Sequence, residues 1–260
     1  MMFFTGMHHP HNAYRVPLAF ISARALKRRK SGFPVGKWIM DSGAFRTIEL
    51  HGGYPEPVEN YAALIRRFAA NGNLLRAVAQ DYMCEPFALA RTGLTIEDHQ
   101  RLTVERYDAL RACDTAGVAI MPVLQGYPPQ SYVDHILLYG DRLEIGAWVG
   151  VGSVCKRNAD PRAIEAVLEA IAAERPDLRL HGFGIKITAL RSPVVRALLY
   201  SADSMAWSFA ARYEGRDGND PTEAVRYREA VERILNPRTL QSLLADLSRA
   251  VEDLTQALTR

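Results

Sequence analysis

The sequence predicts an α/β protein built as a (β/α)8 TIM-type barrel. Short apolar runs, rich in β-branched and aromatic residues, alternate with helix-like segments along 260 residues, which is typical of a parallel sheet. Nearly every run ends in Asp, Gln or Gly. In a barrel the carboxyl ends of all strands meet at one mouth, whereas a doubly wound sheet gathers only the ends beside its switch point. The pattern therefore favours the barrel.

Length and composition predict one domain over residues 1–260. Hydrophobic residues make up 48% and charged residues 23%, and the net charge of +3 is a weak argument for a polyanionic partner. Cys84, Cys113 and Cys155 lack the spacing of a disulfide framework or a zinc ribbon, so we expect no metal site and no cofactor. We find no signal peptide and no apolar run near the roughly 18 residues of a membrane span, so we expect a cytoplasmic protein without a membrane partner.

Seven strands can be placed directly from the apolar runs. The strand candidates are residues 1–6, 37–43, 74–82, 117–126, 147–153, 179–186 and 201–207. The eighth strand has no clear run, and we place an irregular one at 208–216. The helix candidates are 57–72, 95–113, which opens with Thr95 and Asp98 near a capping box, and 160–174, which opens with Asp160 and Pro161. Residues 236–260 form an amphipathic pattern, which predicts a C-terminal helix that packs on the barrel or forms a dimer.

Carboxylates at strand ends are the strongest functional signal. Asp41, Asp81 and Asp203 each follow an apolar run, and Gln125 follows a fourth. A lone Asp at such a place is usually a helix cap or a turn former. A charge at a buried strand tip is costly unless it is compensated, so four polar groups at one mouth predict a shared reaction chamber.

Five segments, in order along the chain, carry a family resemblance. The segments are residues 41–45 (DSGAF), 79–86 (AQDYMCEP), 123–126 (VLQG), 149–154 (VGVGSV) and 202–204 (ADS). They resemble motifs of the tRNA-guanine transglycosylases, with Ala44 in place of a glycine. The resemblance covers about residues 38–207 and implies a barrel enzyme that exchanges a guanine base in a nucleic acid for a 7-deazaguanine.

The resemblance also implies roles for these residues. Asp203 would be the nucleophile that forms a covalent glycosyl-enzyme intermediate, and Asp41 would be the general acid/base or would hold the ribose. A carboxylate can accept both edge donors of guanine, which suits Asp81, while Gln125 or a backbone N–H can donate to the carbonyl. We assign substrate binding to Asp81, Gln125, Gly150, Val151, Gly152, Ser42, Phe45 and Phe183. Tyr82, Met83 and Trp207 are further stacking candidates.

One departure from that family changes the expected substrate. The tRNA enzymes carry a zinc cluster of cysteines and a histidine, and no comparable cluster follows Asp203 here. The chain is more similar to the 7-deazaguanine DNA transglycosylases of the DpdA type, which the segments 3–10, 181–184 and 204–207 resemble. We therefore expect DNA rather than tRNA as the nucleic acid, a preQ0-type 7-deazaguanine as the incoming base, and a homodimer or partner modification proteins as further possibilities.

Basic residues and histidines near the predicted mouth are candidates for phosphate contacts. We assign nucleic-acid contact to His8, His9, Lys27, Arg28, Arg29, Lys156 and Arg157, with the 212–216 loop as a further place. A basic run is equally often a solvated face. Metal binding by the histidines would need a geometry that nothing else in the sequence supports.

Three alternatives stay open from the sequence. The same chemistry can act on tRNA or a free nucleoside. A non-catalytic nucleic-acid-binding paralogue is a second alternative, although it would need none of Asp41, Asp81 and Asp203. An unrelated barrel lyase is the third; it would need a Schiff-base lysine at a strand end, and Lys186 is its one candidate.

Overall fold

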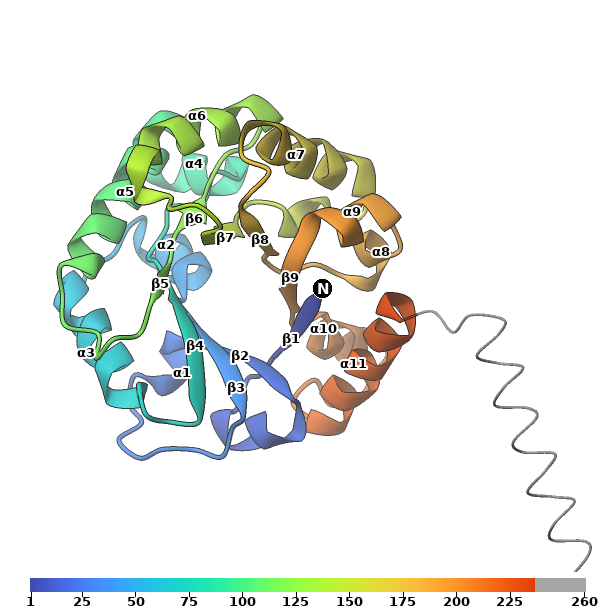
Figure 1. Ribbon diagram of the computed structural model, residues 1–260. Helices are drawn as coiled ribbons and strands as arrows, with labels where there is room; N and C mark the ends of the chain where they lie inside the picture. The colour runs from blue at the N-terminus through green and yellow to red at the C-terminus, as the bar shows by residue number, and fades with distance from the viewer. Residues whose placement is uncertain (237–260) are drawn as a thin grey trace, which may run out of the picture.

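The structure is a computed structural model that describes residues 1–236, and it shows a ring of parallel strands enclosed by helices (Figure 1). The strands are β1 Met2–Gly6, β2 Leu18–Ser22, β3 Lys37–Asp41, β4 Asn73–Val78, β5 Ile120–Met121, β6 Val123–Leu124, β7 Trp148–Val151, β8 Arg179–Gly182 and β9 Leu199–Ser204. The helices are α1 Ala23–Leu26, α2 Ala44–His51, α3 Val58–Phe68, α4 Pro86–Thr92, α5 Ile96–Arg111, α6 Pro129–Tyr139, α7 Pro161–Glu174, α8 Ile187–Leu190, α9 Pro193–Leu198, α10 Ala206–Tyr213 and α11 Pro221–Leu235. Short 3-10 turns are η1 Pro10–Arg15, η2 Gly140–Arg142 and η3 Cys155–Arg157.

The sheet order, β5-β4-β3-β2-β1-β9-β8-β7-β6, closes on itself. Its two ends, β5 and β6, belong to one short stretch interrupted by Pro122, which has no N–H to give to a neighbour. Residues of β5 pair with β4, and residues of β6 pair with β7. Counting this stretch once gives eight strand positions, which confirms the predicted (β/α)8 barrel.

The eighth strand was predicted in the wrong place. Residues 206–213, most of the predicted 208–216 segment, form helix α10, because Trp207 and Ala211 recur at helical spacing and bury one face. The true missing strand is β2, a five-residue run after Pro17 that pairs with both β1 and β3. Residues 237–260, which hold nearly all of the predicted C-terminal helix, lie outside the described part of the chain.

Local sequence explains where the predicted helices begin. Thr95 and Asp98 form a reciprocal capping box at the start of α5, and Asp160 accepts a hydrogen bond from the N–H of Ala163 at the start of α7. α7 buries an apolar stripe, whereas the buried face of α5 also carries His99, Gln100 and Thr103. Within residues 1–236, no helix has the length and apolar composition that crossing a bilayer requires.

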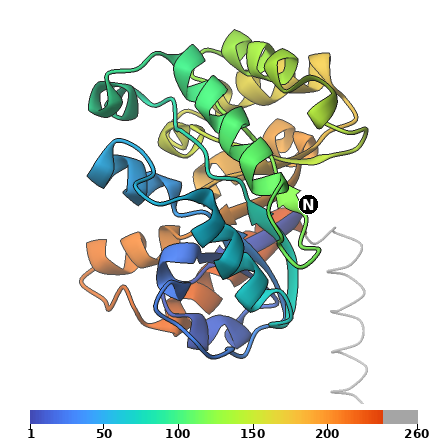
Figure 2. The same ribbon diagram turned by 90° about the vertical axis from the view of Figure 1, so that its left-hand side faces the viewer.

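Side chains fill the inside of the barrel, and the loops after the strands form its mouth. Phe4, Ile39 and Val123 are fully buried members of one large apolar cluster. In Figure 2 the short helices α2 (blue), α4 (teal) and α10 (orange) extend to the left, away from the labelled N-terminus. They follow β3, β4 and β9, so the side to the left is the mouth at which the strand-end acids lie.

Candidate active site

Asp41 closes β3, and a turn of Ser42 and Gly43 leads from it into α2. Gly43 has φ +77 and donates its backbone N–H to Oδ2 of Asp41 at 3.1 Å. A side chain at position 43 would meet Cγ of Arg24 at 2.9 Å in a left-handed conformation, so the turn requires glycine. Burial, and next the charge of Asp203, raise the pKa of Asp41 to about 6.

Asp203 lies near the end of β9 and is 7% exposed. Its Oδ1 accepts from the backbone N–H of Gly184 at 3.1 Å and lies 3.3 Å from Nε2 of His181. Both bonds reach the same oxygen. Because the charge of Asp203 contributes to the raised pKa of Asp41, the two acids predicted to be catalytic lie near each other at the mouth.

Asp81 and Gln125 form a buried pair near these two acids. Nε2 of Gln125 donates to Oδ2 of Asp81, and the two residues are 6% and 1% exposed. Burial is the largest cause that raises the pKa of Asp81 to about 7, and the Gln125 hydrogen bond opposes it while the charge of Asp41 adds to it. The structure therefore brings Asp41, Asp81, Gln125 and Asp203 together.

Two further buried residues, Ser153 and Glu85, hold the orientation of Gln125. Oγ of Ser153 lies 2.9 Å from Oε1 of Gln125 and 3.0 Å from Oε2 of Glu85, and it accepts from the N–H of Cys84. Ser153 has a single hydroxyl hydrogen for two acceptors. Burial raises the pKa of Glu85, and the hydrogen bond from Ser153 lowers it. The single hydroxyl hydrogen of Ser153 goes to Glu85 or to Oε1 of Gln125, and Nε2 of Gln125 faces Asp81.

The backbone conformation of Ser153 supports these hydrogen bonds. Ser153 adopts φ 58, a left-handed conformation that is uncommon for a residue other than glycine. Such conformations persist where the surroundings hold them, and they cluster at functional sites. Sequence reasoning missed Ser153 and Glu85 as site residues. Glu85 lies in the segment that carries the family resemblance, but only the fold shows that its carboxyl turns inward.

The glycines within and just after β7 make room for these groups. A side chain on Gly152 would overlap the amide of Gln125, and one on Gly150 would overlap the ring of Phe183. The N–H groups of Gly150 and Gly152 already donate to carbonyls of the neighbouring strand. If either N–H donated to a base, as predicted, its hydrogen bond within the sheet would break. The space left by the missing side chains has no such cost.

Phe45 and Lys156 meet across the mouth. Nζ of Lys156, which follows β7, lies 4.9 Å from the ring centre of Phe45 on α2 and 5.7 Å from that of Phe87 on α4. Arg157 lies 4.4 Å from the ring centre of Tyr127 and donates to its carbonyl. Neither cation has a carboxylate partner among the ion pairs of residues 1–236.

His8 and His9 follow β1 at the same end of the barrel. Nε2 of His8 lies 2.7 Å from Oγ of Ser208, which donates to the carbonyl of Gly218, so His8 is the donor to that oxygen. Burial and the neighbouring Arg212 lower the pKa of His8. His9 is exposed and stacks on His11. Within residues 1–236 no group of three or more His, Cys, Asp or Glu gathers as metal ligands would.

The basic run after β2 leads away from the mouth. Lys27 pairs with Glu56 just before α3, and Arg28 is exposed. Arg29 donates to the carbonyls of residues 31 and 32, and its own carbonyl accepts from Arg67 near the carboxyl end of α3. That end of α3 precedes β4, so Arg29 lies toward the base of the barrel. The structure therefore places Arg29 away from the acids, whereas Lys27 pairs with a residue at the amino end of α3, the end toward the mouth.

The other named candidates are distributed as follows. Ser42 is buried beside Asp41, and Tyr82 and Met83 pack with Ile48 of α2. Trp207 is buried, with its indole N–H donating to the carbonyl of Gly6. Lys186, the lysine of the lyase alternative, is exposed at the start of α8.

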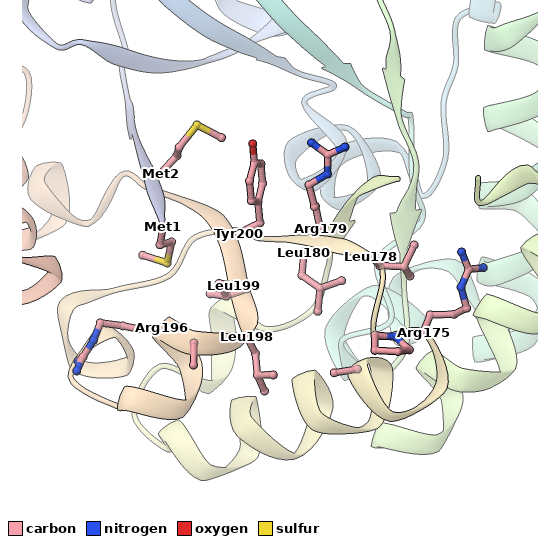
Figure 3. A pocket seen from close by; sticks show the side chains of 13 residues that line it. Met1, Met2, Arg175, Leu178, Arg179, Leu180, Arg196, Leu198, Leu199 and Tyr200 are labelled. Atoms are coloured by element: carbon pink, nitrogen blue, oxygen red, sulfur yellow. The ribbon is translucent and has the colours of Figure 1, made fainter. Parts of the chain in front are cut away.

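A pocket at the opposite end of the barrel is unrelated to these residues. It has a volume of about 540 Å³ and is lined by Met1, Arg179, Arg196 and Tyr200, at the amino ends of β8 and β9 (Figure 3). Asp203 lies at the carboxyl end of β9. The chemistry of the site therefore concerns the mouth alone.

Comparison with known protein families gives one match. A family model described as DpdA: DeoxyPurine in DNA protein A matches residues 1–231. No curated protein matches the chain. The matched range contains all nine described strands and each candidate site residue.

Proposed function

The chain belongs to the DpdA family, deoxypurine in DNA protein A, and we propose that it exchanges guanine in DNA for a 7-deazaguanine base through a covalent bond to Asp203. Membership of the family ties the chain to purine modification in DNA. The reaction, its intermediate and the roles of individual residues are the content of the proposal. We place the activity in the cytoplasm.

The first step forms a glycosyl-enzyme. A carboxylate oxygen of Asp203 attacks C1′ of the target deoxyguanosine, the bond from C1′ to N9 breaks, and guanine leaves with the bonding electrons. Asp41 gives its proton to the departing base. A pKa of about 6 for Asp41 fits this role, because a group with a pKa near the working pH both gives and takes up a proton readily.

The second step returns the enzyme to its starting state. The 7-deazaguanine loses its N9 proton to Asp41 and its N9 attacks C1′, which displaces Asp203 as a carboxylate. The two displacements retain the configuration at C1′, and Asp41 ends with the proton it began with. We favour a preQ0-type base because the family resemblance implies it.

Recognition of the base falls to Asp81 and Gln125. Guanine and 7-deazaguanine share an edge with two donors, N1–H and the exocyclic amine, beside one acceptor. An ionised Asp81 accepts both donors, and the amide of Gln125 lies next to it to reach the carbonyl. Gly150, Val151, Gly152, Ser42, Phe45 and Phe183 would surround the base and sugar.

DNA contact would come from the rim of the mouth. Base chemistry in duplex DNA requires an extruded nucleotide, at a cost of about a few kcal/mol. Lys156 and Arg157 are cations beside aromatic rings, an arrangement that can hold phosphates and stack unpaired bases. His8 and His9 would add contacts from β1, while Lys27, Arg28 and Arg29 would reach only flanking DNA.

One observation carries the proposal: three carboxyl groups and Gln125 lie near one another at the carboxyl ends of β3, β4, β6 and β9, where the charge of Asp203 raises the pKa of Asp41, the charge of Asp41 raises that of Asp81, and Gln125 donates to Asp81. A binding protein gains nothing from this costly arrangement. Retaining base exchange needs a nucleophile, a proton carrier and a reader of the base edge, and each has a group here.

The test is direct. Purified protein is incubated with DNA and preQ0, and the nucleosides are analysed by mass spectrometry; parallel reactions use tRNA and radiolabelled guanine. We expect the 7-deazaguanine nucleoside in DNA, a covalent protein–DNA adduct on a denaturing gel, and loss of both in Asp203→Asn but not in Asp134→Asn, an exposed aspartate on α6. Exchange that persists in Asp203→Asn, or exchange on tRNA alone, contradicts the proposal.

A further inference from the structure

A buried chain of hydrogen bonds leads from β7 to Asp203. Nε1 of Trp148 donates to Oγ of Ser201 at 2.8 Å, Oγ of Ser201 lies 2.9 Å from Nδ1 of His181, and Nε2 of His181 lies 3.3 Å from Oδ1 of Asp203. His181 and Ser201 are fully buried, and Trp148 is 9% exposed. Polar groups inside a barrel are retained only where each has a partner.

The sheet is irregular at this chain. Leu180 pairs with Leu199, but the next residue of β8, His181, pairs with Ser201, so Tyr200 is an extra residue in β9. A bulge of this kind re-aims the side chains that follow it. Here it turns Ser201 toward the imidazole, and two residues later Asp203 points to the same ring.

Donor and acceptor chemistry assigns the protons along the chain. The indole N–H of Trp148 can only donate, so Ser201 receives one hydrogen bond and has its own hydroxyl hydrogen to give. Given to Nδ1 of His181, that hydrogen leaves a neutral imidazole with its proton on Nε2, facing Asp203. The opposite tautomer would point the lone pair of Nε2 at the carboxylate, which is repulsive.

We propose that Trp148 and Ser201 hold His181 as the Nε2–H tautomer. All three are positioning residues, and together they fix which oxygen of Asp203 reacts. His181 and the N–H of Gly184 both bind Oδ1. Oδ2 is then the oxygen that attacks C1′. This assignment rests on the proposed function, in which Asp203 is the nucleophile.

The hydrogen bonds from Trp148 through Ser201 to His181 matter most when Asp203 leaves the sugar. In the glycosyl-enzyme Oδ2 is bonded to C1′ and Oδ1 is an ester carbonyl without full charge. Negative charge returns to Asp203 as the bond from C1′ to Oδ2 breaks, and donors already aimed at Oδ1 stabilise it. With no full charge on Asp203 to orient the imidazole, the hydroxyl of Ser201 selects the tautomer during this step.

The tautomer can be tested without any activity. The side-chain 15N resonances of His181 are recorded in the full-length protein and assigned by their loss in His181→Phe. In Asp203→Asn, where the amide oxygen mimics the ester carbonyl, we expect a protonated Nε2 and a bare Nδ1. In Asp203→Asn combined with Ser201→Ala we expect a mixture of tautomers. A proton on Nδ1 of Asp203→Asn, or identical spectra for the two variants, overturns the assignment.

Kinetics test the consequence. Adduct formation and adduct breakdown are timed separately, per active site, in the wild type, Ser201→Ala, Ser201→Thr and Ser204→Ala, a control from the same strand. A donor to a charged group contributes about tenfold or more. Ser201→Ala loses the donor to Asp203 in those molecules whose His181 carries its proton on Nδ1, so breakdown should slow by up to about tenfold and formation should slow less. Adduct then accumulates, and Ser201→Thr restores breakdown.

The outcomes separate the two proposals. Equal slowing of both steps, or no slowing in Ser201→Ala, overturns the positioning role while the transglycosylase stands. If the wild type forms no adduct and exchanges no base, the proposed function fails, and the tautomer measurement still decides whether Ser201 orders the imidazole.

Discussion

Replacing Asp81 by Asn is expected to stabilise the protein at neutral pH while it removes base exchange. Asp81 is 6% exposed, and its carboxyl group loses hydration on folding. Asn is nearly the same size and keeps an oxygen that can accept from Gln125. It carries no charge that burial would penalise. Asp81, which would read the base, would thus make the folded protein less stable than Asn at the same position.

The magnitude follows from the pKa of the folded state. Burial raises the pKa of Asp81 from 3.8 to about 7, and at about 1.4 kcal/mol per unit this shift is worth about 4 kcal/mol. A raised pKa means that the protonated form favours folding. The stability is therefore fully present below about pH 4 and is lost as the pH rises through about 7. Asp81→Asn should escape that loss.

The assay is urea unfolding of the wild type and Asp81→Asn between about pH 4.5 and 8.5. The difference in unfolding free energy should grow with pH by up to about 1.4 kcal/mol per unit and level off above about pH 7. Asp134→Asn, on the exposed face of α6, is the matched control and should change little with pH. A difference for Asp81→Asn that is flat across this range would refute the argument that burial dominates this carboxyl.

Three further predictions concern base exchange and the binding of DNA. At saturating base and DNA the exchange rate should pass through a maximum near about pH 6, because Asp41 must hold a proton to give to guanine and must have lost it to take one from the incoming base; Asp41→Asn should be slow without this maximum, and a maximum that persists there contradicts the role. Gly152→Ala should weaken base exchange by about 100-fold because the new methyl group displaces Gln125, whereas Gly36→Ala, at an exposed position where the new methyl group makes only an ordinary contact, should not; equal rates would contradict the role of Gln125. Lys156→Gln should lower the slope of log affinity for duplex DNA against log salt by about 0.9 if it contacts a phosphate, and an unchanged slope would place Lys156 off the DNA path.

Most of the fold follows from short-range patterns. The strands at β1, β3, β4, β7, β8 and β9 and the helices α3, α5 and α7 were predicted within a few residues, because their apolar runs and caps are local signals. β2 was not predicted, although it is as long as β1 and β3, and it is identified as a strand by its pairing with both of them. Such a short run takes up strand conformation through tertiary context.

The candidate site was predictable where a residue type and a strand end coincide. Asp41, Asp81, Gln125 and Asp203 fit this description, and the structure places them together. Ser153, Glu85 and Ser201 do not, because serines and a glutamate after a loop have no pattern of their own. Their positions depend on the left-handed turn at residue 153 and the bulge in β9, which are properties of the folded backbone.

The mouth gives its acids different surroundings, and this explains how one site can both read a base and attack a sugar. Oδ1 of Asp203 has two N–H groups within hydrogen-bonding distance, whereas Asp81 lies beside one amide and two other carboxyl groups, and burial raises its pKa to about 7. A guanine edge supplies the two donors that Asp81 lacks, so binding releases the proton. Adenine presents a lone pair at N1 instead, which faces an ionised Asp81 unfavourably. Discrimination between the two purines should therefore increase as the pH rises through about 7, because only the ionised Asp81 rejects that lone pair.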